Sequence, residues 1–312
     1  MTKALVVGGA GFIGSHLVEA LRNDGMDVFV VDNMSLGRPE NVPGVDVFQV
    51  DASNIHAMDK NVFKKIGTVD VAFNLAVVPL PASLHAPKRC FDENVLITST
   101  LCDLTRTGAI DTLIQFSSSE VYGSLVYTPQ DEDHPLYGRT PYAASKAAGD
   151  LLVQSYARTS GIDYSIIRPF NTIGPRQNSG SYAGLIPITV TRLMRGLPAL
   201  IHGDGSFTRD YSYVTDVAQA AVDIYHCDRC RGEIINIGSG EEHSVEEVVM
   251  AIAELFDADA SVEYTTGRPG DVARMRAGTA KAYEFIGYHP SISFEEALEN
   301  TVSWYVRRGK LE

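Results

Sequence analysis

The fold class of this chain is decided by its first residues, Lys3-Ala4-Leu5-Val6-Val7-Gly8-Gly9-Ala10-Gly11-Phe12-Ile13-Gly14. They predict a buried strand that runs into a glycine-rich turn and then into a helix through about Asn23. Strand, glycine-rich turn and helix in this order are the setting of a dinucleotide-binding fingerprint. Gly8 permits the tight turn, Gly11 lets the backbone approach a pyrophosphate, and Gly14 lets the helix lie close to the sheet. The first N–H groups of the helix are free to bind the anion.

A second apolar strand, Val28-Phe29-Val30-Val31, ends at Asp32. A carboxylate at that point accepts hydrogen bonds from the ribose hydroxyls of adenosine, and it repels a 2′-phosphate. The sequence therefore predicts NAD, rather than NADP, as the cofactor.

Short apolar runs alternate with helix-length segments along the first half of the chain. Further strands are expected over 45–50, 69–75, 112–116 and 164–167. This alternation predicts an α/β fold with a Rossmann doubly wound parallel sheet.

After about Arg168 the pattern loosens into loops rich in Gly, Pro and Tyr. Helices are still expected over 185–195 and 214–227, and a strand over 233–237. Capping boxes predict the starts of two later helices, one at Ser244 with Glu247 and one at Ser293 with Glu296. We therefore expect an NAD-binding domain over 1–167, rejoined at about 213–238. A smaller, discontinuous C-terminal substrate lobe would occupy mainly 168–312.

Tyr142 and Lys146 lie four positions apart on a predicted helix, which places the phenol and the ammonium group on one face. Thr140 is a good N-cap, Pro141 suits the first helical position, and Gly161 offers the stop. A free tyrosine has a pKa of about 10, so a base that works near pH 7 needs it lowered by roughly three units, or about 4 kcal/mol. Lys146 and a cationic cofactor ring are the expected sources of that stabilisation.

Composition excludes several other classes of function. A net charge of -13 argues against general binding to nucleic acid or to an anionic membrane. No apolar run approaches the roughly 20 residues of a membrane span, and no signal-peptide pattern precedes the first strand, so a cytoplasmic location is expected. Four cysteines are too few for a disulfide framework. Cys227 and Cys230 have C-x-x-C spacing, but without a second pair or clustered histidines we expect no metal site.

Three motifs together resemble the extended short-chain dehydrogenase/reductases that modify nucleotide sugars. They are Gly8-x-x-Gly11-x-x-Gly14, Tyr142-x-x-x-Lys146 and the segment from Arg168 to Gln177. The resemblance covers essentially the whole chain and implies bound NAD, a nucleotide-diphospho-sugar substrate and a homodimer formed by the helices near 90–107 and 142–160. The cofactor-binding residues expected from the motifs and the resemblance are Gly8, Gly11, Phe12, Ile13, Gly14, Asp32, Asn33, Asp51, Ala52, Leu75, Ala76, Val77, Asn94, Ser117, Tyr142, Lys146 and Pro169.

The resemblance also assigns residues to the substrate and to catalysis. Tyr142, Lys146, Ser118 and Glu120 are the expected catalytic residues. The expected substrate-binding residues are Ser118, Ser119, Glu120, Tyr142, Asn171, Arg176, Arg209, Arg268 and Asp271. Tyr142 would take the proton of the C4 hydroxyl while the C4 hydride passes to NAD, which gives a 4-keto sugar. The segment 77–84 departs from the usual family patterns, so contact with an unusual sugar is expected there.

Three reactions of such a ketone stay open. Glu120, two residues past Ser118, is placed to remove the acidified C5 proton, which favours a 4,6-dehydratase-type lyase. The dehydratases usually present Thr-Asp-Glu where this chain has Ser118-Ser119-Glu120, so a 4-epimerase of the UDP-glucose or UDP-N-acetylglucosamine type follows closely. A UDP-glucuronate decarboxylase is third. A cofactor-sensing protein on the same fold is disfavoured because it would not need Tyr142, Lys146 and Ser118.

Overall fold

A seven-stranded parallel sheet organises the computed structural model, which describes residues 1–178, 183–256, 261–267 and 272–309. The strand order is β11-β6-β5-β4-β1-β2-β3, and every neighbouring pair is parallel. These strands are β1 (Lys3–Val7), β2 (Asp27–Asp32), β3 (Asp46–Gln49), β4 (Val69–Asn74), β5 (Ile110–Phe116), β6 (Asp163–Pro169) and β11 (Ile234–Ile237). The predicted doubly wound Rossmann fold is confirmed.

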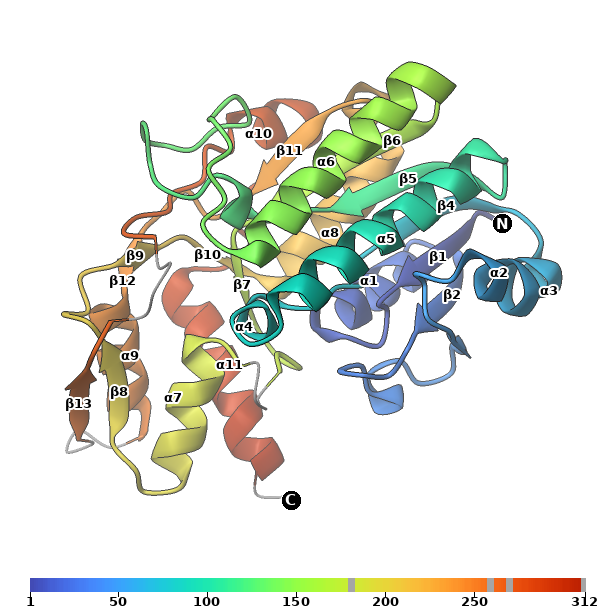
Figure 1. The fold of residues 1–312 in the computed structure, drawn as a ribbon. Helices are drawn as coiled ribbons and strands as arrows, with labels where there is room; N and C mark the ends of the chain where they lie inside the picture. Colours follow the sequence, from blue (N-terminus) through green and yellow to red (C-terminus); the bar gives the residue numbers. More distant parts are fainter. Residues whose placement is uncertain (179–182, 257–260, 268–271, 310–312) are drawn as a thin grey trace.

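Helices cover both faces of this sheet, as Figure 1 shows. α1 (Phe12–Asn23) and α8 (Val214–His226) pack together on one face, and α5 (Pro87–Arg106) and α6 (Pro141–Ser160) pack together on the other. Successive residues of β1 point alternately to the two cores, so Ala4 and Val6 join one apolar cluster and Leu5 and Val7 join the other. A strand buried on both faces needs apolar residues throughout, which explains the continuous apolar run.

The order of the strands reverses between β1 and β4, and this creates the crevice in which open α/β sheets bind ligands. The chain leaves the carboxyl ends of neighbouring strands at Gly8, Asp32, Leu75 and Ser117. Residues that are far apart in the sequence therefore meet at one edge of the sheet.

Short elements connect these strands and helices. They are η1 (Pro39–Asn41), α2 (Ile55–Met58), the π-helical turn η2 (Asp59–Phe63), α3 (Lys64–Ile66), α4 (Leu80–Ser83), η3 (Ser119–Val121) and η4 (Asp228–Cys230).

A second layer of structure lies beyond the carboxyl edge (Figure 1). Its helices are α7 (Leu185–Met194), α9 (Val245–Phe256) and α11 (Phe294–Gly309), while α10 (Ala280–Ile286) packs on β11 and α8. Three strand pairs complete it: β7 (Asn171–Ile173) with β10 (Tyr211–Tyr213), β9 (Thr208–Arg209) with β12 (His243–Ser244), and β8 (Ala199–His202) with β13 (Val262–Thr265). An apolar cluster between α7, α9 and α11 forms its core. The division into two domains remains a prediction.

The helix ends follow the capping signals of the sequence. Thr140 accepts a hydrogen bond from the Ala143 amide at the start of α6, and Gly161 ends that helix with φ +70°. Ser244 and Glu247 form the reciprocal bonds of a capping box before α9. Among the described residues, no helix is both long and apolar enough to cross a membrane.

Candidate active site

A cleft of about 640 Å³ opens at the carboxyl edge of the sheet. Every residue expected to contact the cofactor lines it except Asn94. The expected substrate and catalytic residues that also line it are Ser118, Ser119, Glu120, Asn171 and Arg176. The structure thus gathers most of both predicted sets around one cavity.

The glycine-rich turn fits a bound pyrophosphate. Gly8 has φ +83°, and a Cβ there would lie 2.6 Å from the Ala76 nitrogen. A Cβ on Gly14 would lie 2.2 Å from the Gly8 carbonyl oxygen, so this glycine is needed for close packing of α1 against the turn itself. Gly11 differs, because its φ of -78° suits any residue and a Cβ there would meet only the Gly8 oxygen, at 3.2 Å. Gly11 lines the cleft, and the absence of a side chain there leaves room for a ligand to approach the backbone closely.

Asp32 lies at the end of β2 with its carboxylate held in place. It accepts hydrogen bonds from the amides of Ala10 at 3.1 Å and Met34 at 2.8 Å. Burial raises the pKa of Asp32, and the two amide bonds oppose that shift. A Cβ on Gly37 would lie 2.6 Å from a carboxylate oxygen of Asp32, so the loop closes tightly over it. The position suits recognition of ribose hydroxyls.

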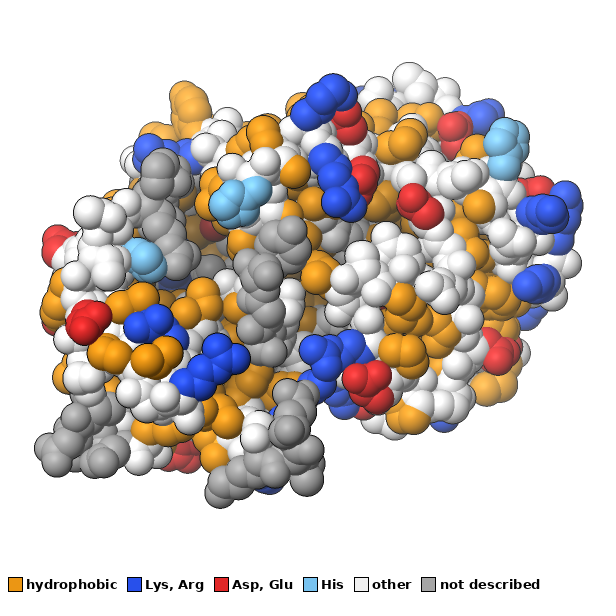
Figure 2. Space-filling model, turned by 60° about the horizontal axis from the view of Figure 1, so that its bottom comes forward, with side chains coloured by type: hydrophobic (Ala, Val, Ile, Leu, Met, Phe, Trp, Pro, Cys, Tyr) orange, Lys and Arg blue, Asp and Glu red, His pale blue; other side chains and the backbone are white. Residues whose placement is uncertain are grey.

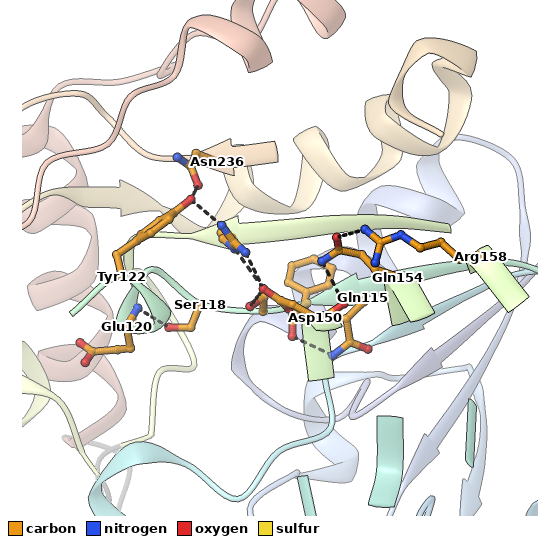
Figure 3. Close-up of polar contacts among 11 residues, drawn as sticks. Gln115, Ser118, Glu120, Tyr122, Asp150, Gln154, Arg158 and Asn236 are labelled. Atoms are coloured by element: carbon orange, nitrogen blue, oxygen red, sulfur yellow. Dashed lines mark hydrogen bonds and ion pairs between the residues drawn. The ribbon is translucent and has the colours of Figure 1, made fainter. Parts of the chain in front are cut away.

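The proton-transfer pair lies at the start of α6, beside the turn that follows β5. Lys146 is buried and donates a hydrogen bond of 2.8 Å to the carbonyl oxygen of Phe116. Tyr142 is half-buried one turn earlier, and a hydrogen bond from Ser118 reaches its phenol. The Ser118 hydroxyl also accepts a bond of 3.2 Å from the Glu120 amide, which Figure 3 shows. The three predicted catalytic groups Tyr142, Lys146 and Ser118 are therefore neighbours.

The protein alone does not give Tyr142 the lowered pKa that a base requires. Burial raises the pKa of Tyr142, and the charge of Glu120 raises it further, while the bond from Ser118 opposes both. Burial also lowers the pKa of Lys146 to about 8, against the opposing effect of Asp150. Positive charge on a ligand bound beside the phenol would oppose these effects and favour the phenolate.

Glu120 and Ser119 occupy the turn η3 on the wall of the cleft. Ser119 is buried, and Glu120 is half-buried. The effect of Glu120 on the pKa of Tyr142 means that its carboxylate lies within electrostatic reach of the phenol. Glu120, Ser118 and Tyr142 thus all line one cleft.

A buried polar network supports this site from behind (Figure 3). Asp150, two turns after Tyr142 on α6, accepts bonds from the Ser117 hydroxyl at 2.9 Å and from the Arg168 guanidinium at 2.9 Å and 3.0 Å. Arg168 also donates to the Tyr122 hydroxyl, which donates to Asn236 on β11 at 2.6 Å. The sequence analysis missed Asp150. Its spacing of four from Lys146 is the signal that would have found it.

Two predicted residues have partners elsewhere. The Asn94 side chain binds the backbone of Val78 and the Ser145 hydroxyl behind the cleft wall. Arg209 donates to the carbonyl oxygens of Thr208 and Val272 and does not line the cleft. Arg268 and Asp271 lie outside the described residues. The ligand-binding roles of these four residues remain predictions.

Basic side chains border the cleft in spite of the negative net charge. Arg176, which pairs with Glu19 on α1, lines it, and sequence reasoning did not single out the lining residues Arg38, Arg89 and Arg308. On the face drawn in Figure 2, Lys and Arg side chains lie both near the middle and along the right-hand edge, several of them beside Asp or Glu. Because these arginines come from separate segments of the chain, no local sequence motif predicts that they meet at the cleft. Arg38 and Arg308 lie near Glu40, and Arg89 pairs with Glu93, so these arginines offer guanidinium donors to an anionic ligand while their charge is partly balanced.

Comparisons with known proteins agree with this geometry. Residues 4–238 match the family model described as the NAD dependent epimerase/dehydratase family. A putative UDP-glucose 4-epimerase of Methanocaldococcus jannaschii is 35% identical over 96% of this chain and 97% of its own length. A UDP-N-acetyl-alpha-D-glucosaminuronate decarboxylase of Bacillus cytotoxicus is 31% identical, with 97% of each chain covered. The crystal structure of a dTDP-glucose 4,6-dehydratase from Streptomyces venezuelae with NAD bound superposes with a TM-score of 0.91 at 30% identity, covering 99% of this chain and 98% of that one.

Proposed function

This chain belongs to the NAD-dependent epimerase/dehydratase family, and we propose that it is a 4,6-dehydratase-type lyase acting on a nucleotide-diphospho-sugar. The cofactor of the family is NAD. The observation that carries the choice of reaction is Glu120, whose carboxylate borders the cleft within electrostatic reach of Tyr142.

The first step is oxidation of the sugar at C4. NAD, when bound, takes up a hydride from carbon and later returns it. The Tyr142 oxygen takes the proton of the C4 hydroxyl, and Ser118 holds that hydroxyl by a hydrogen bond. Lys146, one turn along α6 and bonded to the Phe116 carbonyl, would favour the phenolate over the phenol together with the positive charge of the bound cofactor. The product of this step is a 4-keto sugar still attached to its nucleoside diphosphate.

The second step depends on Glu120. The C4 ketone acidifies the proton on C5, and the Glu120 carboxylate removes it. The same proton then leaves with the C6 hydroxyl as water, which produces a double bond between C5 and C6. Return of hydride to C6 and of a solvent proton to C5, with release of the Tyr142 proton to solvent, completes a 4-keto-6-deoxy sugar. Glu120 serves as both base and acid because its neighbour Ser119 has no titratable carboxyl group.

A 4-epimerase is the second candidate. Its support is the missing acid at Ser119, together with the 4-epimerase among the relatives. An epimerase rotates the 4-keto sugar and returns the hydride to the other face of C4, so it needs no group at C5. A decarboxylase, the reaction of the Bacillus relative, is the third candidate.

Product analysis in deuterium oxide separates the three reactions. The purified protein is incubated with a panel of nucleotide sugars, and products are measured by mass spectrometry and proton NMR. A dehydratase gives a product lighter by one water that carries deuterium at C5. An epimerase gives an isomer without solvent deuterium, and a decarboxylase gives a product lighter by carbon dioxide.

Two variants test the residue roles. Tyr142→Phe is expected to lose turnover by a factor of about 10²–10⁴ while it retains bound NAD. Glu120→Gln is expected to lose elimination to a similar extent. The matched control is Glu299→Gln, which changes an exposed carboxylate on α11 and should keep full activity. An unchanged rate in Glu120→Gln contradicts the lyase proposal, and full activity in Tyr142→Phe contradicts the 4-keto route.

We also propose that the protein is a homodimer through α5 and α6. These two helices pack side by side, and they leave Phe91, Leu96 and Leu151 exposed. Apolar side chains gathered on an exposed helix pair favour a partner there. The expected cytoplasmic location remains a prediction.

A further inference from the structure

The segment Val77–Pro81, here called the apolar wall, lines the cleft that Ser118 and Tyr142 also line. All five residues line the cavity, and α4, which begins within the segment, packs against α5 and α6. Asn94 fixes the wall in place: its side chain accepts from the Val78 amide at 2.7 Å and donates to the Val78 carbonyl at 3.1 Å.

The same asparagine ties the apolar wall to the helix turn that carries the phenol. Its amide nitrogen donates to the Ser145 hydroxyl at 2.9 Å, and that hydroxyl donates to the Tyr142 carbonyl oxygen at 2.7 Å. These bonds hold the apolar wall to the backbone of the helix turn that carries Tyr142, and the wall and Tyr142 line one cleft. A sugar held at Tyr142 would therefore share that cleft with the wall.

The apolar wall offers a sugar few hydrogen-bonding groups. Its side chains are two valines, two prolines and a leucine, and the prolines have no N–H. The Val78 amide and carbonyl are already bound to Asn94. The carbonyl of Pro79 accepts from the Ala82 amide, and that of Leu80 accepts from the Ser83 hydroxyl. A hydroxyl pressed against this surface would lose its water without gaining a partner, whereas a methyl group would gain apolar contact.

From this surface we infer that the nucleotide sugar carries an N-acyl methyl group where it meets the apolar wall. The inference rests on the proposed function and narrows its substrate class. Under the lyase reaction the methyl belongs to an N-acyl group, because the C6 hydroxyl is the leaving group. Val78, which lines the cleft and whose backbone is fixed by Asn94, is the residue through which the inference is tested.

Binding measured without turnover tests the inference. Calorimetric titrations use the NAD-loaded Tyr142→Phe variant with UDP-glucose, UDP-N-acetylglucosamine and a 6-deoxy counterpart of UDP-glucose. A methyl group in an apolar pocket discriminates by about 10–200-fold, so UDP-N-acetylglucosamine should bind about tenfold or more tightly than UDP-glucose. A preference for the 6-deoxy ligand alone contradicts the inference, because the proposed lyase reaction needs a C6 hydroxyl.

Val78→Thr, added to the same background, replaces a methyl by a hydroxyl with almost no change of shape. It should reduce the preference by about tenfold, while Val126→Thr on an exposed loop should leave it unchanged. Circular dichroism and retained NAD show that each variant is folded. Equal affinity for the three ligands, or a preference unaffected by Val78→Thr in a folded protein, overturns the inference while the proposed function stands. Failure of every nucleotide sugar to react with the unmodified protein overturns the proposed function instead.

Discussion

Substituting Asn for Asp150 removes the charge that balances Arg168 beneath the active site. The two side chains are 0% and 2% exposed, and their closest atoms are 2.9 Å apart. Removing one partner of a buried ion pair leaves an uncompensated charge, which typically costs about 3–5 kcal/mol. Asp150→Asn retains the size of the side chain and one oxygen for the Ser117 hydroxyl, so the loss comes mainly from the charge.

Urea denaturation measures this effect. Asp150→Asn should lower the unfolding free energy by about 3–5 kcal/mol with an unchanged dependence on urea. The matched control is Asp92→Asn, which breaks the exposed pair with Lys88 on α5 and should cost less than about 1 kcal/mol. Comparable losses in the two variants would refute the view that Arg168 depends on Asp150. A double variant, Asp150→Leu with Arg168→Met, should recover part of the loss, because no buried charge then remains.

Three further predictions concern the cofactor turn, the buried lysine and the dimer. Gly11→Ala should keep the melting temperature of the NAD-free protein but weaken NAD binding. Gly14→Ala should lower both the melting temperature and the affinity for NAD, because only its Cβ would collide with the turn, at 2.2 Å from the Gly8 oxygen. Thermal scans with and without NAD check this, and equal effects of the two variants contradict it. Lys146 has a folded pKa of about 8, below its unfolded value, so the unfolded chain binds more protons between pH 8 and 10.5 and stability rises with pH in that window. Relative to Lys146→Met, the unfolding free energy of the unmodified protein should therefore rise by roughly 3 kcal/mol from pH 8 to 10.5, measured by urea unfolding at each pH. A difference between the two proteins that does not change with pH contradicts the lowered pKa of Lys146. Leu151→Glu on α6 should convert a dimer to a monomer in light scattering, and a monomeric unmodified protein contradicts the proposed interface.

The sequence predicts the sheet well because each strand carries its own local signal. Continuous apolar runs and glycine or proline stops fix the strands, and the alternation with helices fixes their parallel arrangement. The expected strands over 69–75 and 164–167 appear as β4 and β6 with small differences at the ends. Such differences are normal, since hydrogen bonding at the ends of elements depends on neighbouring segments.

The site is predicted where a motif and a strand end coincide, as at Gly8, Asp32 and Ser118. The site is not predicted where a side chain has several possible hydrogen-bond partners that only the folded structure brings close. Asn94 turns to the backbone of Val78, and Arg209 turns to nearby carbonyl groups. No local pattern encodes those choices. The raised pKa of Tyr142 was equally hidden, because burial and the charge of Glu120 arise only from the folded arrangement.

The position of the edge strand β11 has a consequence for how the chain folds during its synthesis. It pairs with β6, yet the chain between them builds β7, α7, β8 and α8 first. While the ribosome, at about 5–20 residues per second, adds that intervening stretch, β6 presents a bare row of amide and carbonyl groups for several seconds. A nascent chain whose synthesis stops in that interval would expose an unpaired strand edge and be prone to aggregate. A chaperone that covers strand edges would be most useful at that stage.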